Sequence, residues 1–306
     1  MTGVVGPSFV IHSRRMSTHP LLVTHHSPDL DAISAVWLFK RFDAQGFAHA
    51  KVAFVNPGQT LSANEAAQFE AAPHEVTHVD TGLGEFDHHQ PDRGLQYLSA
   101  AKLVFFHLQT IHPELQQDIA LKTLVDFVTD VDQFAEIEWP DAANPRYCLM
   151  IQELVHGLER QPDHDDLMQL EFGMRMLDAG YAVISEQLEA QIELETKGHV
   201  FALQRGSGIS RETGNDATIK LAQKQGHMLV IKKDPKTGNV RIKLRPDAGF
   251  DLSLLRDAIL QKDRVGSWYY YPSGRMLLNG SDKHRDQKAS PLTVEQVTNL
   301  VKELYG

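Results

Sequence analysis

The sequence predicts an α/β protein in which a parallel sheet carries helices on both faces and a smaller C-terminal α/β domain follows it. Three observations predict this class. Strand-like and helix-like segments alternate over residues 20–80, and polar clusters directly follow two of the predicted strands. From residue 200 onward, the chain changes to short apolar runs separated by turn residues. The alternation of strands and helices is typical of parallel sheets. The change to short apolar runs from residue 200 onward predicts a second domain.

The N-terminal elements follow a β-α-β-α-β order. Strands are predicted over residues 20–24, 51–55 and 75–80, and the helices between them over residues 32–42 and 63–72. In such sheets, ligands bind beyond the carboxyl ends of the strands. Both polar clusters lie at such ends, one after Thr24 and the other after Val79.

The middle of the chain is predicted to be helical. Three helices are expected, over residues 97–111, 115–129 and 147–159. A long charged amphipathic stretch from about 164 to 198 is the best candidate for a linker. We therefore expect a catalytic domain, a helical linker and a substrate-recognition domain, over residues 16–160, 161–199 and 200–306.

The second domain offers polar groups that suit a phosphorylated ligand. Residues 228–244 predict a β-hairpin around a Pro-Lys-Thr-Gly turn. Alternation places Arg241, Lys243 and Arg245 on one strand face, either as a phosphate-binding surface or as a charged edge strand in solvent. Residues 279–281 form either an anion-binding nest or a plain β-turn. The predicted substrate-binding residues are Lys243, Arg245, Arg275, Asn279, Ser281, Lys283 and His284.

Composition limits the classes of function. The formal net charge of −10 argues against a large non-specific nucleic-acid surface, although it leaves a local basic patch open. Apolar runs fall short of the ~20 residues that cross a bilayer, so we expect no membrane partner. The single cysteine, Cys148, cannot form an internal disulfide, which favours a cytoplasmic protein. A homodimer stays an open alternative.

The first polar cluster is His25-His26-Ser27-Pro28-Asp29-Leu30-Asp31, between a strand and a helix. Carboxylate oxygens suit Mg²⁺ and Mn²⁺, and imidazole shifts the preference toward Mn²⁺. Aspartates at a helix N-terminus also act as caps. Capping needs only one of Asp29 and Asp31, and it does not require His25.

The second cluster begins at Asp80 and ends with Asp87-His88-His89. Glycines at positions 82 and 84 allow a sharp turn, so the triplet can return to the sheet edge that Asp80 ends. A lone histidine here would be a surface or hydrogen-bonded residue, but the joint pattern favours a metal site. At the end of a predicted helix, Asp130 is a further candidate ligand and Asp132 is the alternative to it.

Together these motifs resemble the DHH phosphoesterase superfamily. Its first motif, a strand followed by H-x-x-P-D-x-D-A, is matched by His25, Pro28, Asp29, Asp31 and Ala32. Asp80 matches the second motif, Asp87-His88-His89 the third and Asp130 the fourth. The run Phe86–Gln90 is also similar to the melanocyte-proliferating-gene branch of exonucleases. The glycine-rich G-G-G-H signature of many nucleic-acid-cleaving relatives is absent from the sequence.

The resemblance implies a site for two divalent ions, Mn²⁺ first and Mg²⁺ as the alternative. It implies that one ion is held by His25, Asp29 and Asp80, and the other by Asp31, Asp80, His88 and Asp130. It also implies catalytic roles for Asp80, for His89 at the phosphate, and for Asp87 as an orienting group. Two adjacent cations activate water and offset charge on the leaving oxygen, so no serine or cysteine nucleophile is required.

The sequence therefore predicts a metal-dependent phosphoesterase that acts on a nucleotide, a short oligonucleotide or a cyclic dinucleotide. Its partner would be a small phosphorylated substrate or a short nucleic acid. Two alternatives remain. One is a hydrolase of pyrophosphate or polyphosphate, and the other is a non-catalytic nucleotide-binding regulator with the same fold.

Overall fold

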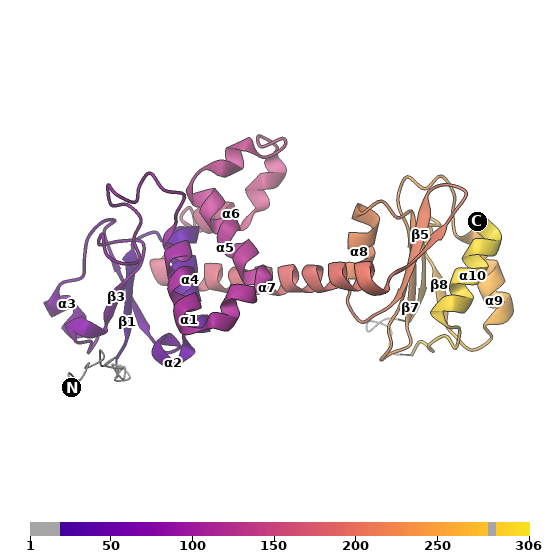
Figure 1. The fold of residues 1–306 in the computed structure, drawn as a ribbon, viewed down its shortest axis with the longest axis horizontal. Helices are drawn as coiled ribbons and strands as arrows, with labels where there is room; N and C mark the ends of the chain where they lie inside the picture. Colours follow the sequence, from indigo (N-terminus) through magenta and orange to yellow (C-terminus); the bar gives the residue numbers. More distant parts are fainter. Residues whose placement is uncertain (1–18, 281–285) are drawn as a thin grey trace, which may run out of the picture. The chain divides into compact units, whose positions relative to one another are not determined.

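The computed structural model describes residues 19–280 and 286–306. It divides into two compact units, the first ending at Tyr181 and the second beginning at Ala182. The division falls inside α7 (Asp166–Lys197), a continuous helix of 32 residues in the segment predicted to be a linker (Figure 1). The domain limits that we expect from the sequence stay predictions.

A parallel three-stranded sheet forms the base of the first unit. Its order is β2-β1-β3, with β1 at Leu21–His25, β2 at Lys51–Val55 and β3 at Val76–His78. The chain passes from β1 through α1 (Leu30–Phe42) to β2, and then through α3 (Ala63–Gln68) to β3. Because β1 is central, the chain leaves its carboxyl end toward β2 and later returns at β3 on the other side. The ends of β1 and β3 thus flank the switch point where such sheets bind ligands.

Helices cover both faces of this sheet, which confirms the predicted α/β class. Leu21 and Val55 pack with Ala66 of α3 on one face. Leu22 alternates to the other face, where it is fully buried on the side of α1. Figure 1 shows α3 and α1 on opposite sides of the strands, and α4 (Ala100–Ile111) packs on α1.

The helix after α4 differs from its predicted range. Residues Pro113–Gln117 form a 3-10 turn, and α5 begins only at Ile119, where the Asp118 side chain caps it. α5 then runs to Asp132, beyond the predicted end at residue 129. The remaining short helical elements are α2 (Ala44–Phe47), α6 (Ile151–Leu158) and 3-10 turns at Pro73–Glu75, Ala135–Glu138 and Pro145–Leu149. Within the described ranges, no helix combines the length and the apolar character needed to cross a membrane.

The second unit contains a mixed six-stranded sheet of order β4-β5-β6-β7-β9-β8. Its strands are β4 (His199–Ala202), β5 (Ser207–Glu212), β6 (Leu229–Lys233), β7 (Val240–Leu244), β8 (Trp268–Tyr270) and β9 (Met276–Asn279). β6 and β7 form the predicted hairpin. β7 carries Arg241 and Lys243, whereas Arg245 follows its last residue. β7 lies between β6 and β9, so the edge-strand interpretation of these cations is wrong.

Helices lie on both faces of the second sheet as well. α8 (Ala217–Lys224) packs on one face through a cluster that contains Ile209, Ile219 and Val230. α9 (Ser253–Lys262) and α10 (Val294–Tyr305) cover the other face over a larger core, and Figure 1 shows them opposite α8.

Asn279 provides a test of the second unit's fold. Its amide nitrogen donates to the carbonyl oxygens of Ser267 and Lys288, both at 2.9 Å, and its Oδ1 accepts the Ser290 N–H at 2.7 Å. The side chain is fully buried. We predict that Asn279→Ala lowers the free energy of unfolding by about 3 kcal/mol or more, because each buried group left unpaired costs about 1–3 kcal/mol. Urea unfolding would measure this.

The control is Gln261→Ala, an exposed residue of α9, which we expect to stay within about 0.5 kcal/mol of the wild type. Equal unfolding midpoints for Asn279→Ala and the wild type would show that this hydrogen-bonded loop does not stabilise the unit.

Candidate metal centre

The first polar cluster lies where β1 ends and α1 begins. His25 is the last residue of β1, and Asp29 caps α1 by accepting a backbone N–H of its first turn at 3.0 Å. Asp31 is buried, and its two oxygens accept the N–H groups of Ala100 and Ala101 at 2.6 and 2.8 Å. Capping of α1 thus occupies Asp29, whereas Asp31 joins the start of α1 to the start of α4.

Asp80 follows β3 in a strained backbone conformation. Its φ of +54° lies in the left-handed region, which costs a residue with a side chain roughly 1–2 kcal/mol. The Asp80 N–H donates to the carbonyl oxygen of Phe86 at 2.9 Å, and Val79 forms a β-bridge with Phe86. The chain therefore returns directly beside β3. This return places the carboxylate of Asp80 next to residues 87–89.

The three residues of the Asp-His-His run have separate positions. Asp87 is buried, and its carboxylate accepts the N–H of Leu83 at 2.7 Å and that of His89 at 3.0 Å. It also bonds to Nδ1 of His89 at 2.8 Å, which orients that ring. The side chain of His89 is 60% exposed, whereas that of His88 is 8% exposed. His88 therefore points into the cluster and His89 is accessible to a ligand.

The structure brings these side chains together around Asp80 and His88. Nε2 of His25 lies 3.2 Å from Oδ2 of Asp80, and Nε2 of His88 lies 3.5 Å from the other oxygen, Oδ1. Nε2 of His88 is also 3.6 Å from Asp31 and 3.5 Å from Asp132. Three groups have ligand atoms within 4.8 Å of one another: His25, Asp29 and Asp80; Asp31, His88 and Asp132; and Asp80, His88 and His89.

Two buried atoms at the centre of this cluster indicate what it is built to hold. Oδ1 of Asp80 and Nε2 of His88 have no hydrogen-bond partner among the residues that the structure describes. Buried polar atoms are nearly always paired, so such atoms require an explanation. Both are potential metal-ligand atoms, and they belong to overlapping groups. The donor set therefore fits divalent cations bound on either side of Asp80.

The pKa values of the clustered side chains also favour a site for cations. Burial, together with the charges of Asp80 and Asp132, raises the pKa of Asp31 well above its ordinary value. Burial also raises the pKa of Asp132. Burial by itself would lower the pKa of His25, but its hydrogen bond to Asp80 and the nearby charge of Asp29 raise it to about 9. The carboxylates thus repel one another, and positive charge placed among them would relieve that repulsion.

Of the two aspartates that end α5, Asp132 lies in the cluster. The carboxylate of Asp130 instead accepts the hydroxyl of Tyr97 at 2.7 Å. Asp132 is held in place by Gln133, which donates to it at 3.0 Å and to the carbonyl oxygen of Leu98 at 2.8 Å. The geometry therefore favours Asp132 over Asp130, our first choice from the sequence.

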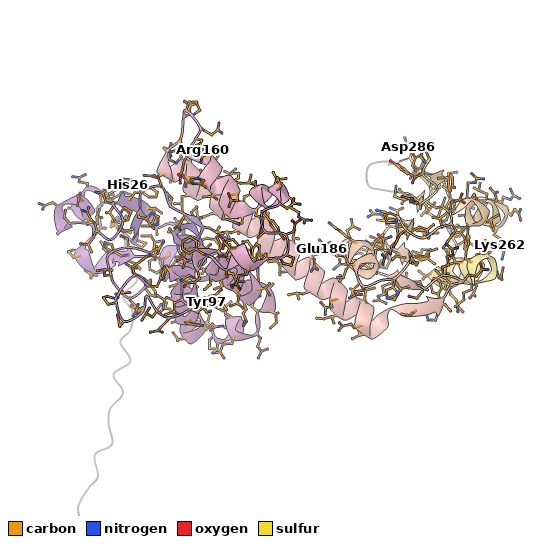
Figure 2. The ribbon with its side chains drawn as sticks, turned by 90° about the horizontal axis from the view of Figure 1, so that it is seen from above. His26, Tyr97, Arg160, Glu186, Lys262 and Asp286 are labelled. Carbon is orange, nitrogen blue, oxygen red and sulfur yellow. The ribbon has the colours of Figure 1, made fainter. Side chains whose placement is uncertain are left out.

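Sequence reasoning missed two residues of α7 that hold the first cluster. Asp166 bonds to Nδ1 of His26 at 2.6 Å and accepts the N–H of Ser27 at 2.7 Å. Gln169 is fully buried and donates to the carbonyl oxygen of Pro28 at 3.0 Å. Figure 2 labels His26 in the first unit. Both residues come from the segment predicted to be a linker, where nothing in the sequence pairs them with residues 26–28.

A cavity of about 210 Å³ adjoins the ligand groups. Its polar wall includes Asp29, Asp31 and Asp132. Valines at positions 128, 131 and 155 line another part, and Phe134 also borders it with a side chain that is 72% exposed. The cavity therefore joins the acidic cluster to an apolar surface, an arrangement that suits a phosphate with an organic substituent.

The predicted substrate-binding residues belong to the second unit. Asn279 uses its amide within the fold, as described above. Arg245 forms two hydrogen bonds to Asp247, at 2.9 and 2.7 Å. Lys243 is half-buried on β7, and Arg275 is exposed just before β9. The other three, Ser281, Lys283 and His284, lie outside the described residues. Binding by this set stays a prediction.

Among known proteins, the chain is similar to solved structures but matches no family model or curated sequence. Its similar solved structures include DHH-domain proteins. One is a DHH domain described as a member of a family of ribosomal proteins, with 12% identity and a TM-score of 0.31 over 93% of this chain and 86% of the other. Another is the exonuclease RecJ bound to manganese, with 12% identity and a TM-score of 0.29. That match covers 92% of this chain and 89% of the other.

RecJ of Thermus thermophilus with Mn²⁺ matches at 12% identity and a TM-score of 0.32, over 92% of this chain. The match covers 51% of that protein, so the chain spans about half of its length. At these identities and TM-scores, no activity transfers from one protein to another. The chemistry of the cluster therefore rests on its own side chains.

We predict that Asp132→Asn and Asp130→Asn affect metal binding differently. Asp132→Asn should weaken Mn²⁺ binding about 100-fold or more, because even residues behind the ligands of a metal contribute 10–100-fold. Asp130→Asn should change the affinity less than about twofold, since Asp130 belongs to none of the ligand groups. Titration of free Mn²⁺ by electron paramagnetic resonance would measure both affinities.

Thermal unfolding separates loss of a ligand from loss of structure. Without metal, Asp132→Asn should leave the melting temperature unchanged or raised, because it removes one of the mutually repelling carboxylates. A larger loss of Mn²⁺ affinity in Asp130→Asn than in Asp132→Asn would return the ligand role to Asp130.

Proposed function

We propose that the chain is a two-metal phosphoesterase of the DHH type that hydrolyses a phosphodiester of a nucleotide, a short oligonucleotide or a cyclic dinucleotide. The observation that carries the proposal is the position of Asp80. Its carboxylate belongs to two ligand groups, and its Oδ1 is buried without a hydrogen-bond partner among the described residues. A carboxylate in that position is suited to bridge two cations.

Two of the three groups supply the proposed ligands, and Asp80 joins them because it shares a further group with His88. His25, Asp29 and Asp80 would hold one ion, and Asp31, Asp80, His88 and Asp132 the other. This is the set that the DHH motifs imply, with Asp132 in place of Asp130. Mn²⁺ is our first choice of metal because the set combines imidazole with carboxylates. The similar RecJ structures were described with Mn²⁺ or Mg²⁺.

When bound, such a pair of ions activates water as the nucleophile and offsets charge on the leaving oxygen. His89 is the exposed member of the Asp-His-His run, and Asp87 holds its Nδ1 at 2.8 Å. Nδ1 donates to the carboxylate of Asp87. Nε2 would therefore donate to a phosphate oxygen in the charged imidazolium form of the ring, in which both nitrogens donate and Asp87 balances the charge. Asp87 thus acts as a positioning residue for His89.

The cavity beside the cluster supports an organic phosphate over an inorganic one. Pyrophosphate has no apolar part to place against the valines at 128, 131 and 155 or against Phe134. A nucleoside group has both an apolar ring face and polar edges. The apolar wall therefore favours a nucleotide diester, and we expect faster turnover of a dinucleotide than of pyrophosphate.

We predict that the protein hydrolyses bis(p-nitrophenyl) phosphate in the presence of Mn²⁺ and that EDTA abolishes this activity. Asp80→Ala should lower kcat/KM by about a thousandfold or more, since it removes the residue shared by both ion sites. Release of p-nitrophenol, measured by its absorbance, would follow the reaction, with Asp130→Asn as the matched control.

Full activity of Asp80→Ala, or activity that survives EDTA, would refute the two-metal proposal. Binding of nucleotides without turnover in Mn²⁺ would favour the non-catalytic regulator instead.

A further inference from the structure

The backbone of Phe134 has an unfavourable conformation directly beside the metal centre. Its φ of +58° lies in the left-handed region, which is disfavoured for a residue with a bulky side chain. Phe134 follows Asp132 by two residues, where α5 has ended, and its N–H donates to the carbonyl oxygen of Val131 at 3.0 Å. Strained residues of this kind cluster at ligand-binding sites, because the strain persists only where the surrounding structure enforces it.

The side chain of Phe134 is also left largely in solvent. It is 72% exposed, although burial of a phenyl ring is favourable. Other aromatic rings of this segment pack on one another. Phe127 stacks on Trp139 with ring centroids 5.8 Å apart, and Trp139 contacts Tyr147 at 5.9 Å. Phe134 has no such ring partner among the residues that the structure describes. The fold therefore keeps an aromatic face accessible next to the metal centre.

The cavity that Phe134 borders offers further groups to a ligand. Asp132 lines it together with Gln152 and His156 of α6, which lie one turn apart on the same side of that helix. Oε1 of Gln152 is buried and has no hydrogen-bond partner within the described part of the chain. A buried acceptor without a partner requires an explanation, and a donor supplied by a ligand provides one. The cavity thus fits an aromatic ring that carries N–H groups on its edge.

We propose that Phe134 is a specificity-determining residue, on whose ring a nucleobase of the substrate stacks while the adjoining phosphate lies at the metal centre. Every base has a π-face, so such a platform accepts nucleosides of any base. The inference rests on the proposed function and deepens it, since it makes the nucleoside next to the scissile phosphate the group that the protein recognises.

The strained backbone has a role in this arrangement. It fixes the ring relative to Asp132 before the substrate arrives, so less conformational freedom is lost when a base binds. Phe134 acts on the base and not on the reacting atoms. Its loss should therefore raise KM more than it lowers kcat.

Two esters that share a leaving group test the proposal. Thymidine 5′-(p-nitrophenyl phosphate) carries a base and methyl p-nitrophenyl phosphate carries none, and both release p-nitrophenol. We compare kcat/KM for the thymidine ester with kcat/KM for the methyl ester, in Mn²⁺. Phe134→Ala should lower this ratio about tenfold or more, the loss expected when one stacked base is no longer supported. Phe134→Trp should keep the ratio within about threefold of the wild type, because stacking needs an aromatic face.

The matched control is Ile137→Ala. Ile137 lies in the 3-10 turn that follows Phe134, is also 72% exposed, and is not among the residues that line the cavity. Its substitution should leave the ratio of the two kcat/KM values unchanged. Circular dichroism would verify that all three variants are folded.

Fluorescence provides a readout that needs no turnover. Thymidine 5′-monophosphate in Mg²⁺ should quench the emission that Phe134→Trp adds, because a base stacked on an indole ring quenches its fluorescence. The wild type is the reference. None of its three tryptophans lines the cavity, so the nucleotide should change its emission much less.

The proposal is overturned if Phe134→Ala leaves the ratio unchanged or if Ile137→Ala lowers it as much. It is also overturned if the nucleotide quenches Phe134→Trp no more than the wild type. A dimer in sedimentation that Phe134→Ala breaks would assign the ring to a second copy of the chain, and would overturn the proposal as well.

The two proposals can fail separately. Hydrolysis of both esters with an unchanged ratio in Phe134→Ala would remove the inference on Phe134 alone. Quenching of Phe134→Trp without hydrolysis of either ester would remove the metal-centre proposal and keep Phe134 as a base platform. Absence of both hydrolysis and quenching would remove both.

Discussion

The carboxylate of Asp80 is the constraint on which the first unit depends. It is buried, contacts His25 on one side and His88 on the other, and sits on a left-handed backbone. Neither burial nor the backbone conformation stabilises the fold, since both cost free energy. Structures keep such features where surrounding contacts enforce them. Here the return of the chain beside β3 does so, and it brings the Asp-His-His run to the same sheet edge.

The other elements of the unit can be understood as supports for this centre. The parallel order of β1 and β3 puts His25 and Asp80 at neighbouring strand ends. Asp31 accepts the first N–H groups of α4, so the helix dipole stabilises its charge and fixes α4 against α1. α7 holds the turn after β1 through Asp166 and Gln169. Contacts distant in sequence thus position groups that two short motifs supply.

Much of this arrangement could be predicted from the sequence, because strand ends and turn residues are local signals. The strand at residues 51–55 matches β2, and the hairpin at 228–244 forms as expected. From the sequence we favoured Asp130 over Asp132, and the geometry reverses that choice, because residues two apart on a helix point about 200° apart and only one of them faces the cluster. Which aspartate faces the cluster depends on where α5 ends and on how α5 packs against the rest of the first unit. Asn279 shows a similar limit, since its buried partners at 267, 288 and 290 cannot be inferred from a turn motif.

In the proposed function, charge balance would link the binding of metal to the binding of substrate. The centre holds four carboxylates, from Asp29, Asp31, Asp80 and Asp132, and in their ionised form these repel a phosphodiester. Two divalent ions carry four positive charges, so the loaded centre would be close to neutral with its histidines uncharged. A substrate phosphate is then no longer excluded.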